Sequence, residues 1–193
     1  MMRVAVLFSG RGSNMQVLAE HMARPEVEAE FVLGLSNRPE AGGLSYCAEI
    51  GVEAHAIDHK AYDSRAAFDA ELNKALRAAK VDLICCAGFM RLLTAEFVDG
   101  WRDRIINIHP SLLPKYKGLH THKRAIEAGD KEAGCSVHYM RPEMDEGPVI
   151  VQRRVPILDS DTPETLAARV LVEEHIAYPE ALDMVLKKMA GTA

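Results

Sequence analysis

Short apolar runs alternate with stretches of helical periodicity along most of the chain, and this alternation limits the possible folds more than any other feature. The runs are RVAVLF (3–8), EAEFVLGLSN (28–37), VEAHAI (52–57), VDLICCAG (81–88) and RIINIH (104–109). Strands this apolar must be covered on both faces, which parallel sheets achieve by placing helices on either side. The pattern therefore predicts a doubly wound, mostly parallel α/β sheet with helices on both faces.

The last part of the chain departs from this alternation. Two strand-like runs, 133–140 and 148–157, are separated only by the residues RPEMDEG. Parallel strands need a crossover of about a dozen or more residues, so we expect a late antiparallel hairpin here. Thr162, Pro163 and Glu164 then make a good helix start, with a hydroxyl at the N-cap and proline at the first helical position. We expect the longest helix to follow.

Length and composition favour one domain over residues 1–193. The chain has 193 residues, of which 48% are hydrophobic and 26% charged, as in an ordinary globular protein. No apolar run approaches the roughly 20 residues of a membrane helix, and the opening MMRVAVLFSG is unlike a signal peptide, so we expect a cytoplasmic protein. The net charge of −5 argues against a nucleic-acid partner. The cysteines include no C-x-x-C pair, which favours free buried thiols.

The segment SGRGSN (9–14) follows the first run and opens a helical pattern. Backbone N–H groups and the helix dipole at such a junction favour a phosphate, and glycines allow a close approach. The segment is not the dinucleotide fingerprint, because Met15 and Gln16 stand where a third glycine would come. A bare strand-to-helix turn is the alternative. The additional donors Ser13 and Asn14 favour a monophosphate site.

Asn107 and His109 lie two residues apart at the end of the fifth run, so in an extended backbone both side chains point the same way. An amide can stabilise a carbonyl oxygen that becomes an oxyanion, and an imidazolium beside it can supply charge or a proton. The alternative is a turn asparagine beside an ordinary histidine. Pro110 and Pro114 stiffen the loop that follows, and this favours a catalytic pair.

Asp145 lies in the sequence MDEGP, between the two runs of the expected hairpin. A solvated turn residue is the simplest interpretation of such an acid. If the hairpin tip folds over the strand ends, however, this carboxylate can contact His109 and favour the charged form of the imidazole. His138, which alternates with Ser136 and Met140 along one strand, could border the same site.

A metal site is the runner-up interpretation. His120 and His122, together with His109, could hold a metal ion in a metal-dependent hydrolase, with Asp145 as a further ligand. The same stretch also reads as an ordinary helix start, and neither H-E-x-x-H nor a cysteine pair supports zinc. Surface or packing roles are expected for the remaining histidines: His21, His55, His59 and His175.

These motifs together resemble the phosphoribosylglycinamide formyltransferases, a family of folate-dependent enzymes of purine synthesis. The resemblance covers almost the whole chain and rests on VLFSGRGSN, CAGFMRLL, NIHPSLLPKYKGLHTH, SVHYM, the D-x-G-P of Asp145 to Pro148, and EEHIAYP (173–179). It departs at Lys117, where proline is common in the family. It implies the formyltransferase fold and transfer of a formyl group from 10-formyltetrahydrofolate to the amine of glycinamide ribonucleotide, without a metal.

The resemblance also implies roles for individual residues. Asn107 and His109 would stabilise a tetrahedral oxyanion, with His109 as proton donor and Asp145 holding the imidazole charged and oriented. The residues implied to hold the ribonucleotide are Gly12, Ser13, Asn14 and Glu174. The residues implied to hold the folate are Arg65, Met90, Arg91, Leu92, Leu93, Asn107, Arg141, Pro142, Glu143, Met144 and Asp145.

Two other families share the SLLP loop. Methionyl-tRNA formyltransferase carries an additional carboxyl-terminal domain that binds tRNA, and formyltetrahydrofolate hydrolase carries an additional amino-terminal regulatory domain. Neither addition is expected in a chain of this length, so both functions are disfavoured. A non-catalytic module that binds a ribonucleotide monophosphate without turnover is a third alternative. The oligomeric state is not predicted by the sequence.

Overall fold

The computed structural model describes residues 1–191 and divides the chain into two compact units, Met1–Ile106 and Asn107–Ala193. The boundary falls within strand β5 (Ile105–His109), so Asn107 and His109 both belong to the second unit. The single domain expected over residues 1–193 stays a prediction.

The first unit is built around parallel strands in the order β3-β2-β1-β4. The strands are β1 (Met2–Phe8), β2 (Ala29–Ser36), β3 (Ala54–Ala56) and β4 (Leu83–Cys86). Residues 4–8 of β1 and 83–85 of β4 are completely buried, as expected for strands that are apolar on both faces. The predicted parallel arrangement is confirmed.

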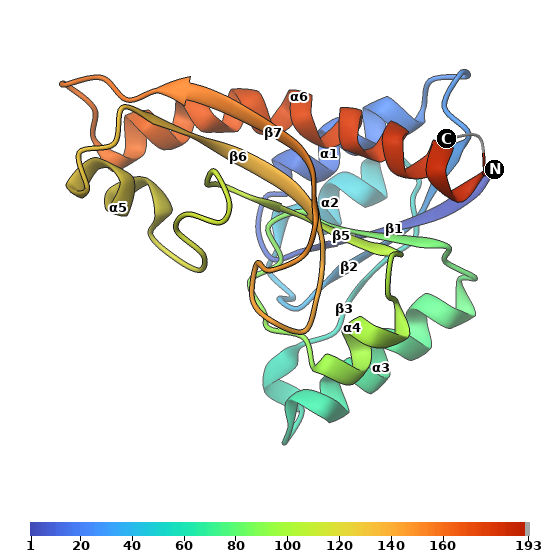
Figure 1. Ribbon diagram of the computed structural model, residues 1–193. Coiled ribbons are helices and arrows are strands. Elements are labelled where there is room, and N and C mark those ends of the chain that lie inside the picture. Colours follow the sequence, from blue (N-terminus) through green and yellow to red (C-terminus); the bar gives the residue numbers. More distant parts are fainter. Residues whose placement is uncertain (192–193) are drawn as a thin grey trace. The chain divides into compact units, whose positions relative to one another are not determined.

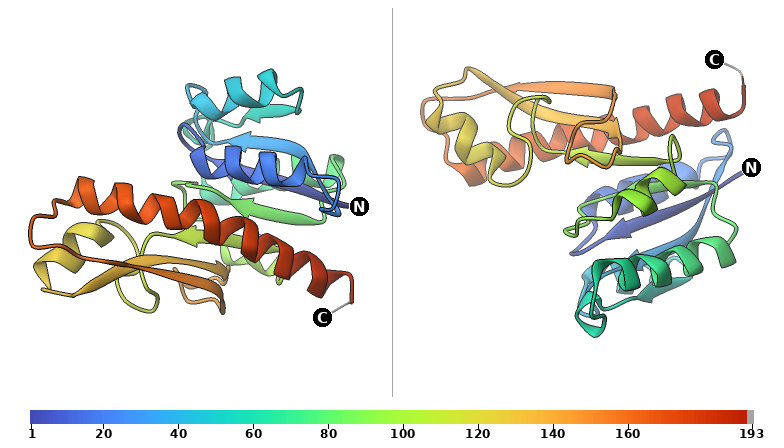
Figure 2. Two further views of the ribbon diagram at one scale, coloured as in Figure 1. Left: turned by 90° about the horizontal axis from the view of Figure 1, so that it is seen from above. Right: turned by 60° about the horizontal axis from the view of Figure 1, so that its bottom comes forward.

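Helices cover both faces of these strands. They are α1 (Ser13–Met22), α2 (Gly42–Glu49), the short 3₁₀ helix η1 (His59–Ala61), α3 (Arg65–Ala78) and α4 (Ala95–Gly100). Figures 1 and 2 show α1 and α2 on one face and α3 and α4 on the other. Ser64 and Thr94 cap α3 and α4 through their side-chain hydroxyls, whereas no side chain caps α1, whose N-cap is Gly12.

The second unit consists of a hairpin and two helices. Its elements after β5 are α5 (Thr121–Glu127), β6 (Glu132–Tyr139), β7 (Val149–Pro156) and α6 (Pro163–Met189). The strands β6 and β7 pair antiparallel with an irregularity at Val137 and His138, which confirms the expected hairpin. The helix α6 packs on both strands. It is the longest of the described helices, and it begins with the predicted cap at Thr162.

Gly147 allows the hairpin to close. The amide of Tyr139 donates to the carbonyl of Pro148 over 3.0 Å, so the chain returns tightly against the end of β6. A Cβ atom built on Gly147 would lie 1.5 Å from the carbonyl oxygen of Tyr139, which is a collision with backbone. The glycine of the D-x-G-P motif is therefore required by close approach, and it fixes the position of Asp145 two residues earlier.

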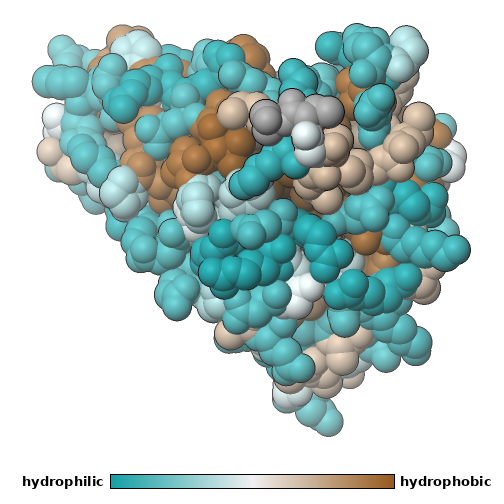
Figure 3. Space-filling model, turned by 45° about the vertical axis from the view of Figure 1, so that its right-hand side comes forward, coloured by the Kyte–Doolittle hydropathy of each residue, from teal (hydrophilic) through white to brown (hydrophobic). Residues whose placement is uncertain are grey.

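The described residues contain no helix that is both long enough and apolar enough to cross a membrane. The face drawn in Figure 3 is covered largely by hydrophilic side chains, with hydrophobic ones gathered in patches. The four cysteines are buried and form no disulfide, as the sequence predicts. Burial raises the pKa of the Cys47 thiol to about 11, so this cysteine is a neutral, unreactive part of the core.

Candidate active site

Two of the predicted catalytic side chains come from β5 and the third from the hairpin connection. His109 is buried, with 6% of its surface exposed, and its Nδ1 atom lies 3.5 Å from Oδ2 of Asp145. The backbone of Asp145 is left-handed, with a φ of 54°. The amide of Gly118 donates to its Oδ2 over 2.9 Å. The structure therefore brings an imidazole and a carboxylate from distant parts of the sequence into contact.

The second ring nitrogen of His109 is also occupied. Nε2 lies 2.9 Å from the carbonyl oxygen of Tyr116, and because a carbonyl can only accept, Nε2 carries a hydrogen. Nδ1 then faces the carboxylate of Asp145, which stabilises positive charge on the ring. Two oxygen acceptors thus hold the imidazole in one orientation.

His138 connects Asn107 to this pair. Its Nε2 atom lies 3.3 Å from Nδ2 of Asn107 and 3.7 Å from Oδ1 of Asp145. Its Nδ1 atom donates to the carbonyl of Tyr139 over 3.0 Å, so in the neutral ring Nε2 has a lone pair that accepts from the Asn107 amide. One N–H of Asn107 is therefore directed at His138, and the other can serve an oxyanion.

Burial lowers the pKa of His138 below its ordinary value of 6.5, and the nearby positive charge of His109 acts in the same direction. The hydrogen bond to the Tyr139 carbonyl and the charge of Asp145 oppose this shift without reversing it. A protonated His138 could not accept a hydrogen bond from Asn107. The contact between these two side chains therefore requires the neutral form of His138.

The depressed pKa of His138 predicts a loss of stability in acid. A histidine whose pKa is lowered on folding contributes stability above its unfolded pKa of about 6.5, and this contribution is lost as the pH falls toward the folded value. We expect the unfolding free energy, measured by urea denaturation between pH 7.5 and 5.5, to fall less steeply in His138→Gln than in the unmodified chain. One proton accounts for at most about 1.4 kcal/mol per pH unit. An unchanged slope would contradict the assignment, and the exposed His55→Gln is the control.

The loop after β5 is fastened to the hairpin by the buried hydroxyl of Ser136. This hydroxyl donates to the carbonyl of Ser111 over 2.7 Å and accepts from the amide of Leu113 over 3.1 Å. Gln152 adds hydrogen bonds to the same hydroxyl and to the Leu113 carbonyl. Lys117, the departure from the family pattern, contacts Glu146 in the hairpin connection. The loop that carries the Tyr116 carbonyl is therefore held against the hairpin by side-chain hydrogen bonds.

Gly12, Ser13 and Asn14 lie in the first unit, where they open α1. Gly12 is the N-cap, with a φ of 74°, a conformation that favours glycine. No side chain forms a capping hydrogen bond at the start of this helix, so its first-turn N–H groups are not satisfied by a cap. This arrangement suits a small anion such as a phosphate.

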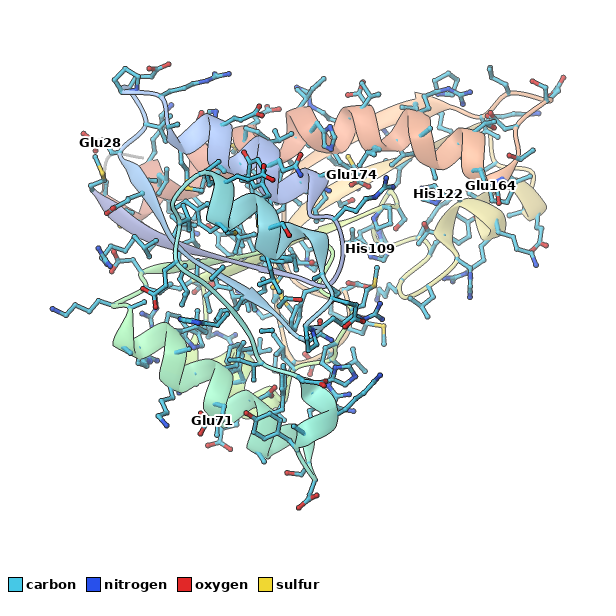
Figure 4. All side chains as sticks on the ribbon, turned by 180° about the vertical axis from the view of Figure 1, so that it is seen from behind. Glu28, Glu71, His109, His122, Glu164 and Glu174 are labelled. Atoms are coloured by element: carbon cyan, nitrogen blue, oxygen red, sulfur yellow. The ribbon has the colours of Figure 1, made fainter. Side chains whose placement is uncertain are left out.

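The other predicted binding residues divide between the two units. In the first unit Arg65 begins α3 and is exposed, Met90 and Leu92 are exposed, Arg91 is partly buried and Leu93 is buried. In the second unit Arg141 and Pro142 are partly buried, whereas Glu143 and Met144 are exposed. Figure 4 labels Glu174 on α6 and His109 at the end of β5. Glu174 is buried, with 8% of its surface exposed.

The two histidines of the proposed metal site lie at the start of α5. His120 is the N-cap and His122 lies in the first turn. Burial and the positive charge of His109 together lower the pKa of His122, and its Nε2 atom is buried without a hydrogen-bond partner. Within residues 1–191, no group of three or more His, Cys, Asp and Glu side chains is arranged to hold a metal ion.

Several contacts at the site were not foreseen from the sequence. The sequence placed His138 only at the border of the site, whereas it contacts both Asn107 and Asp145. The carbonyl of Tyr116 and the amide of Gly118 are backbone groups, so no residue type reveals them. The position of His138 within the motif SVHYM was the one available signal.

Comparison with known proteins identifies the family to which this α/β chain belongs. The model of the formyl transferase family matches residues 2–182, and the chain belongs to that family. It is 42% identical to the phosphoribosylglycinamide formyltransferase of Escherichia coli over 178 residues, which are 92% of this chain and 84% of that protein.

Longer proteins and solved structures are also similar. The chain is 50% identical over 193 residues to the trifunctional purine biosynthetic protein adenosine-3 of Drosophila melanogaster, of which it spans only 14%. The crystal structure of phosphoribosylglycinamide formyltransferase from Brucella melitensis is 47% identical, with a TM-score of 0.90 over 95% of this chain and 94% of that one. These similarities confirm the fold class, and they give no support to a metal-dependent hydrolase.

Proposed function

We propose that this chain transfers the formyl group of 10-formyltetrahydrofolate to the amine of glycinamide ribonucleotide, a step of purine synthesis. The observation that carries the proposal is that Asp145 contacts both His109 and His138, and that His138 contacts Asn107, in a member of the formyl transferase family. The match to most of the length of the E. coli phosphoribosylglycinamide formyltransferase supports the choice of substrates.

The reaction requires stabilisation of negative charge and the movement of one proton. The amine nitrogen attacks the formyl carbon, the carbonyl oxygen becomes an oxyanion, and the carbon–nitrogen bond to the folate then breaks. The other N–H of Asn107 and a protonated ring of His109 would oppose the charge on that oxygen. A proton leaves the attacking amine and one is delivered to the folate nitrogen, so the reaction is balanced. The proposal assigns this proton donation to His109, with the carboxylate of Asp145 facing its ring.

The ribonucleotide would be held by two groups of different charge. The uncapped start of α1, at Gly12, Ser13 and Asn14, suits its phosphate, because backbone N–H groups and the helix dipole both favour an anion there. Glu174 is an acid that can accept hydrogen bonds from hydroxyl or amine groups of the same substrate.

The folate would contact the segment at 90–93 and the hairpin connection at 141–145. Met90, Leu92 and Met144 have 63%, 51% and 49% of their surfaces exposed, and exposed apolar side chains of this size suit a flat aromatic ring. Arg65 at the start of α3 is exposed and can pair with a carboxylate of the folate tail.

A direct assay tests the proposed function. The absorbance change that accompanies formation of the tetrahydrofolate product is followed with glycinamide ribonucleotide as acceptor, in the presence and absence of EDTA. We expect turnover that needs both substrates and resists the chelator. Loss of activity in EDTA and recovery with zinc would favour the metal-dependent hydrolase instead. Binding of the ribonucleotide without turnover would identify a non-catalytic module.

A further inference from the structure

The segment from Gly88 to Thr94, which follows β4, exposes apolar side chains on a firmly held backbone. Met90 has 63% of its surface exposed and Leu92 has 51%. Exposed apolar side chains on a mobile loop would be unremarkable, but a fixed backbone that presents them is typical of a binding surface. The groups that fix this backbone therefore determine how the surface is presented.

Ser9 holds the beginning of the segment with two hydrogen bonds. Its backbone amide donates to the carbonyl of Gly88 over 3.1 Å, and its hydroxyl oxygen accepts from the amide of Met90 over 2.7 Å. Ser9 follows directly after β1, which pairs with β4, so one residue at the end of β1 clamps the chain where it leaves the neighbouring strand. The amide of Met90 is thereby directed inward, while its side chain is directed outward.

Asn37 orients the hydroxyl of Ser9. The hydroxyl donates to Oδ1 of Asn37 over 2.5 Å, which leaves its lone pairs for the amide of Met90. Both side chains are buried, with 4% of Ser9 and 1% of Asn37 exposed. On its other side Asn37 is held by His59, whose Nδ1 atom lies 2.9 Å from the Asn37 carbonyl. A chain of hydrogen bonds thus runs from η1 to the backbone of the segment, and its central Ser9–Asn37 bond is buried.

Two further contacts hold the rest of the segment. The ring of Phe89 stacks on that of Phe68 with centroids 6.5 Å apart, and the amide of Thr94 donates to Oδ2 of the buried Asp69 over 2.6 Å. Among the described residues, the hydroxyl of Ser9 is the hydrogen-bond partner of the Met90 amide. Loss of the serine hydroxyl would therefore release the backbone of Met90 without releasing either neighbouring anchor.

We propose that Ser9 and Asn37 are positioning residues for the folate substrate, because they fix the backbone of Met90 in the orientation that presents the apolar face of the segment. The inference rests on the proposed function and deepens it. Neither residue need touch the folate itself. The hydroxyl and the amide act through the backbone of residue 90, so their removal weakens folate binding and leaves the reacting groups in the second unit intact.

The neighbouring turn at residues 10–12 is held by hydrogen bonds of its own. The loss of the Ser9 hydroxyl should therefore affect folate binding and not ribonucleotide binding. The carbonyl of Gly10 accepts from the amide of Gly43 over 3.1 Å, and the carbonyl of Gly12 accepts from the amide of Gln16 over 2.9 Å. Neither bond involves the side chain of Ser9. The proposed phosphate site should therefore survive the loss of the serine hydroxyl, although it begins only three residues later, at Gly12.

Steady-state kinetics of Ser9→Ala test the inference. We expect the KM for 10-formyltetrahydrofolate to rise about tenfold, because the amide of Met90 and the buried side chain of Asn37 both lose their partner. The KM for glycinamide ribonucleotide should change by less than about twofold, and kcat should fall less than the folate KM rises. Hydrogen–deuterium exchange of the peptide that contains residue 90 should become faster. Asn37→Ser, which keeps the Ser9 hydroxyl but shortens its partner, should move both measurements in the same direction to a smaller extent.

Ser36→Ala is the matched control. Ser36 is buried like Ser9 and lies at the end of the adjacent strand, and the substitution removes the same oxygen atom. Its hydroxyl, however, bonds to the backbone of Arg38. An unchanged folate KM in folded Ser9→Ala, or an equal rise in folate KM in Ser36→Ala, would overturn the positioning role. Formyl transfer by the wild-type chain would still support the proposed function in that case. A wild-type chain that binds no tetrahydrofolate would refute the proposed function, and the positioning role with it.

Discussion

Replacement of His109 by alanine is expected to lower kcat for formyl transfer by about 10²–10⁴-fold. The imidazole is buried and is held between the carbonyl of Tyr116 and the carboxylate of Asp145, so alanine removes both the charge that opposes the oxyanion and the proton donor. Neither role is filled by a neighbour, because burial lowers the pKa of His138 and keeps that ring neutral.

The measurement is kcat in the absorbance assay, together with ribonucleotide binding by calorimetry. Binding should be nearly unchanged, because the proposed phosphate site is made by backbone at the start of α1. His55→Ala is the matched control, since it removes an exposed imidazole that pairs with Glu53. Activity of His109→Ala within about threefold of the unmodified chain would contradict the catalytic role.

Asp145→Asn is expected to lower kcat by about a hundredfold or more with little change in structure. Asparagine tolerates the left-handed backbone at this position better than most residues do. Its amide oxygen can still accept from Gly118, as Oδ2 of the acid does. What the substitution removes is the negative charge 3.5 Å from Nδ1 of His109, and with it the stabilisation of the positive ring.

Glu146→Gln provides a sharp comparison for this variant. Glu146 is the next residue of the same connection, and its exposed carboxylate pairs with Lys117. Both substitutions replace a carboxylate by an amide within one loop, but only one of them faces the imidazole. We expect Glu146→Gln to keep nearly full activity. Equal losses in the two variants would show that general disturbance of the loop, and not the charge at Asp145, is responsible.

Much of the fold follows from local patterns. Strands β1 and β4 were predicted because a run such as VDLICCAG is stable only when both of its faces are covered, and residues 83–85 are indeed completely buried. The hairpin was predicted because RPEMDEG is too short for a crossover. In contrast, the run 52–57 formed only the three-residue strand β3, which pairs with β2 and in which His55 and Ala56 are exposed.

The candidate site was predictable in part. The alternation of Asn107 and His109 on an extended strand placed both on one face, but their contact with Asp145 depends on how the hairpin connection closes. That closure uses a glycine that approaches the Tyr139 carbonyl and a left-handed residue. Ser9 and Asn37, which are 28 residues apart in sequence, carry no motif of their own. Contacts that use backbone atoms or distant polar pairs arise only when the chain is folded.

The carbonyl of Tyr116 has a chemical consequence for the order of events in a turnover. It accepts the Nε2 hydrogen of His109, as the accepting atom of a substrate would in the proposed reaction. In the proposed reaction, transfer of that hydrogen would begin when a substrate atom replaces the Tyr116 carbonyl as its acceptor. The backbone oxygen of Tyr116 thus occupies the position beside Nε2 that the accepting atom of a substrate would take in the proposed reaction.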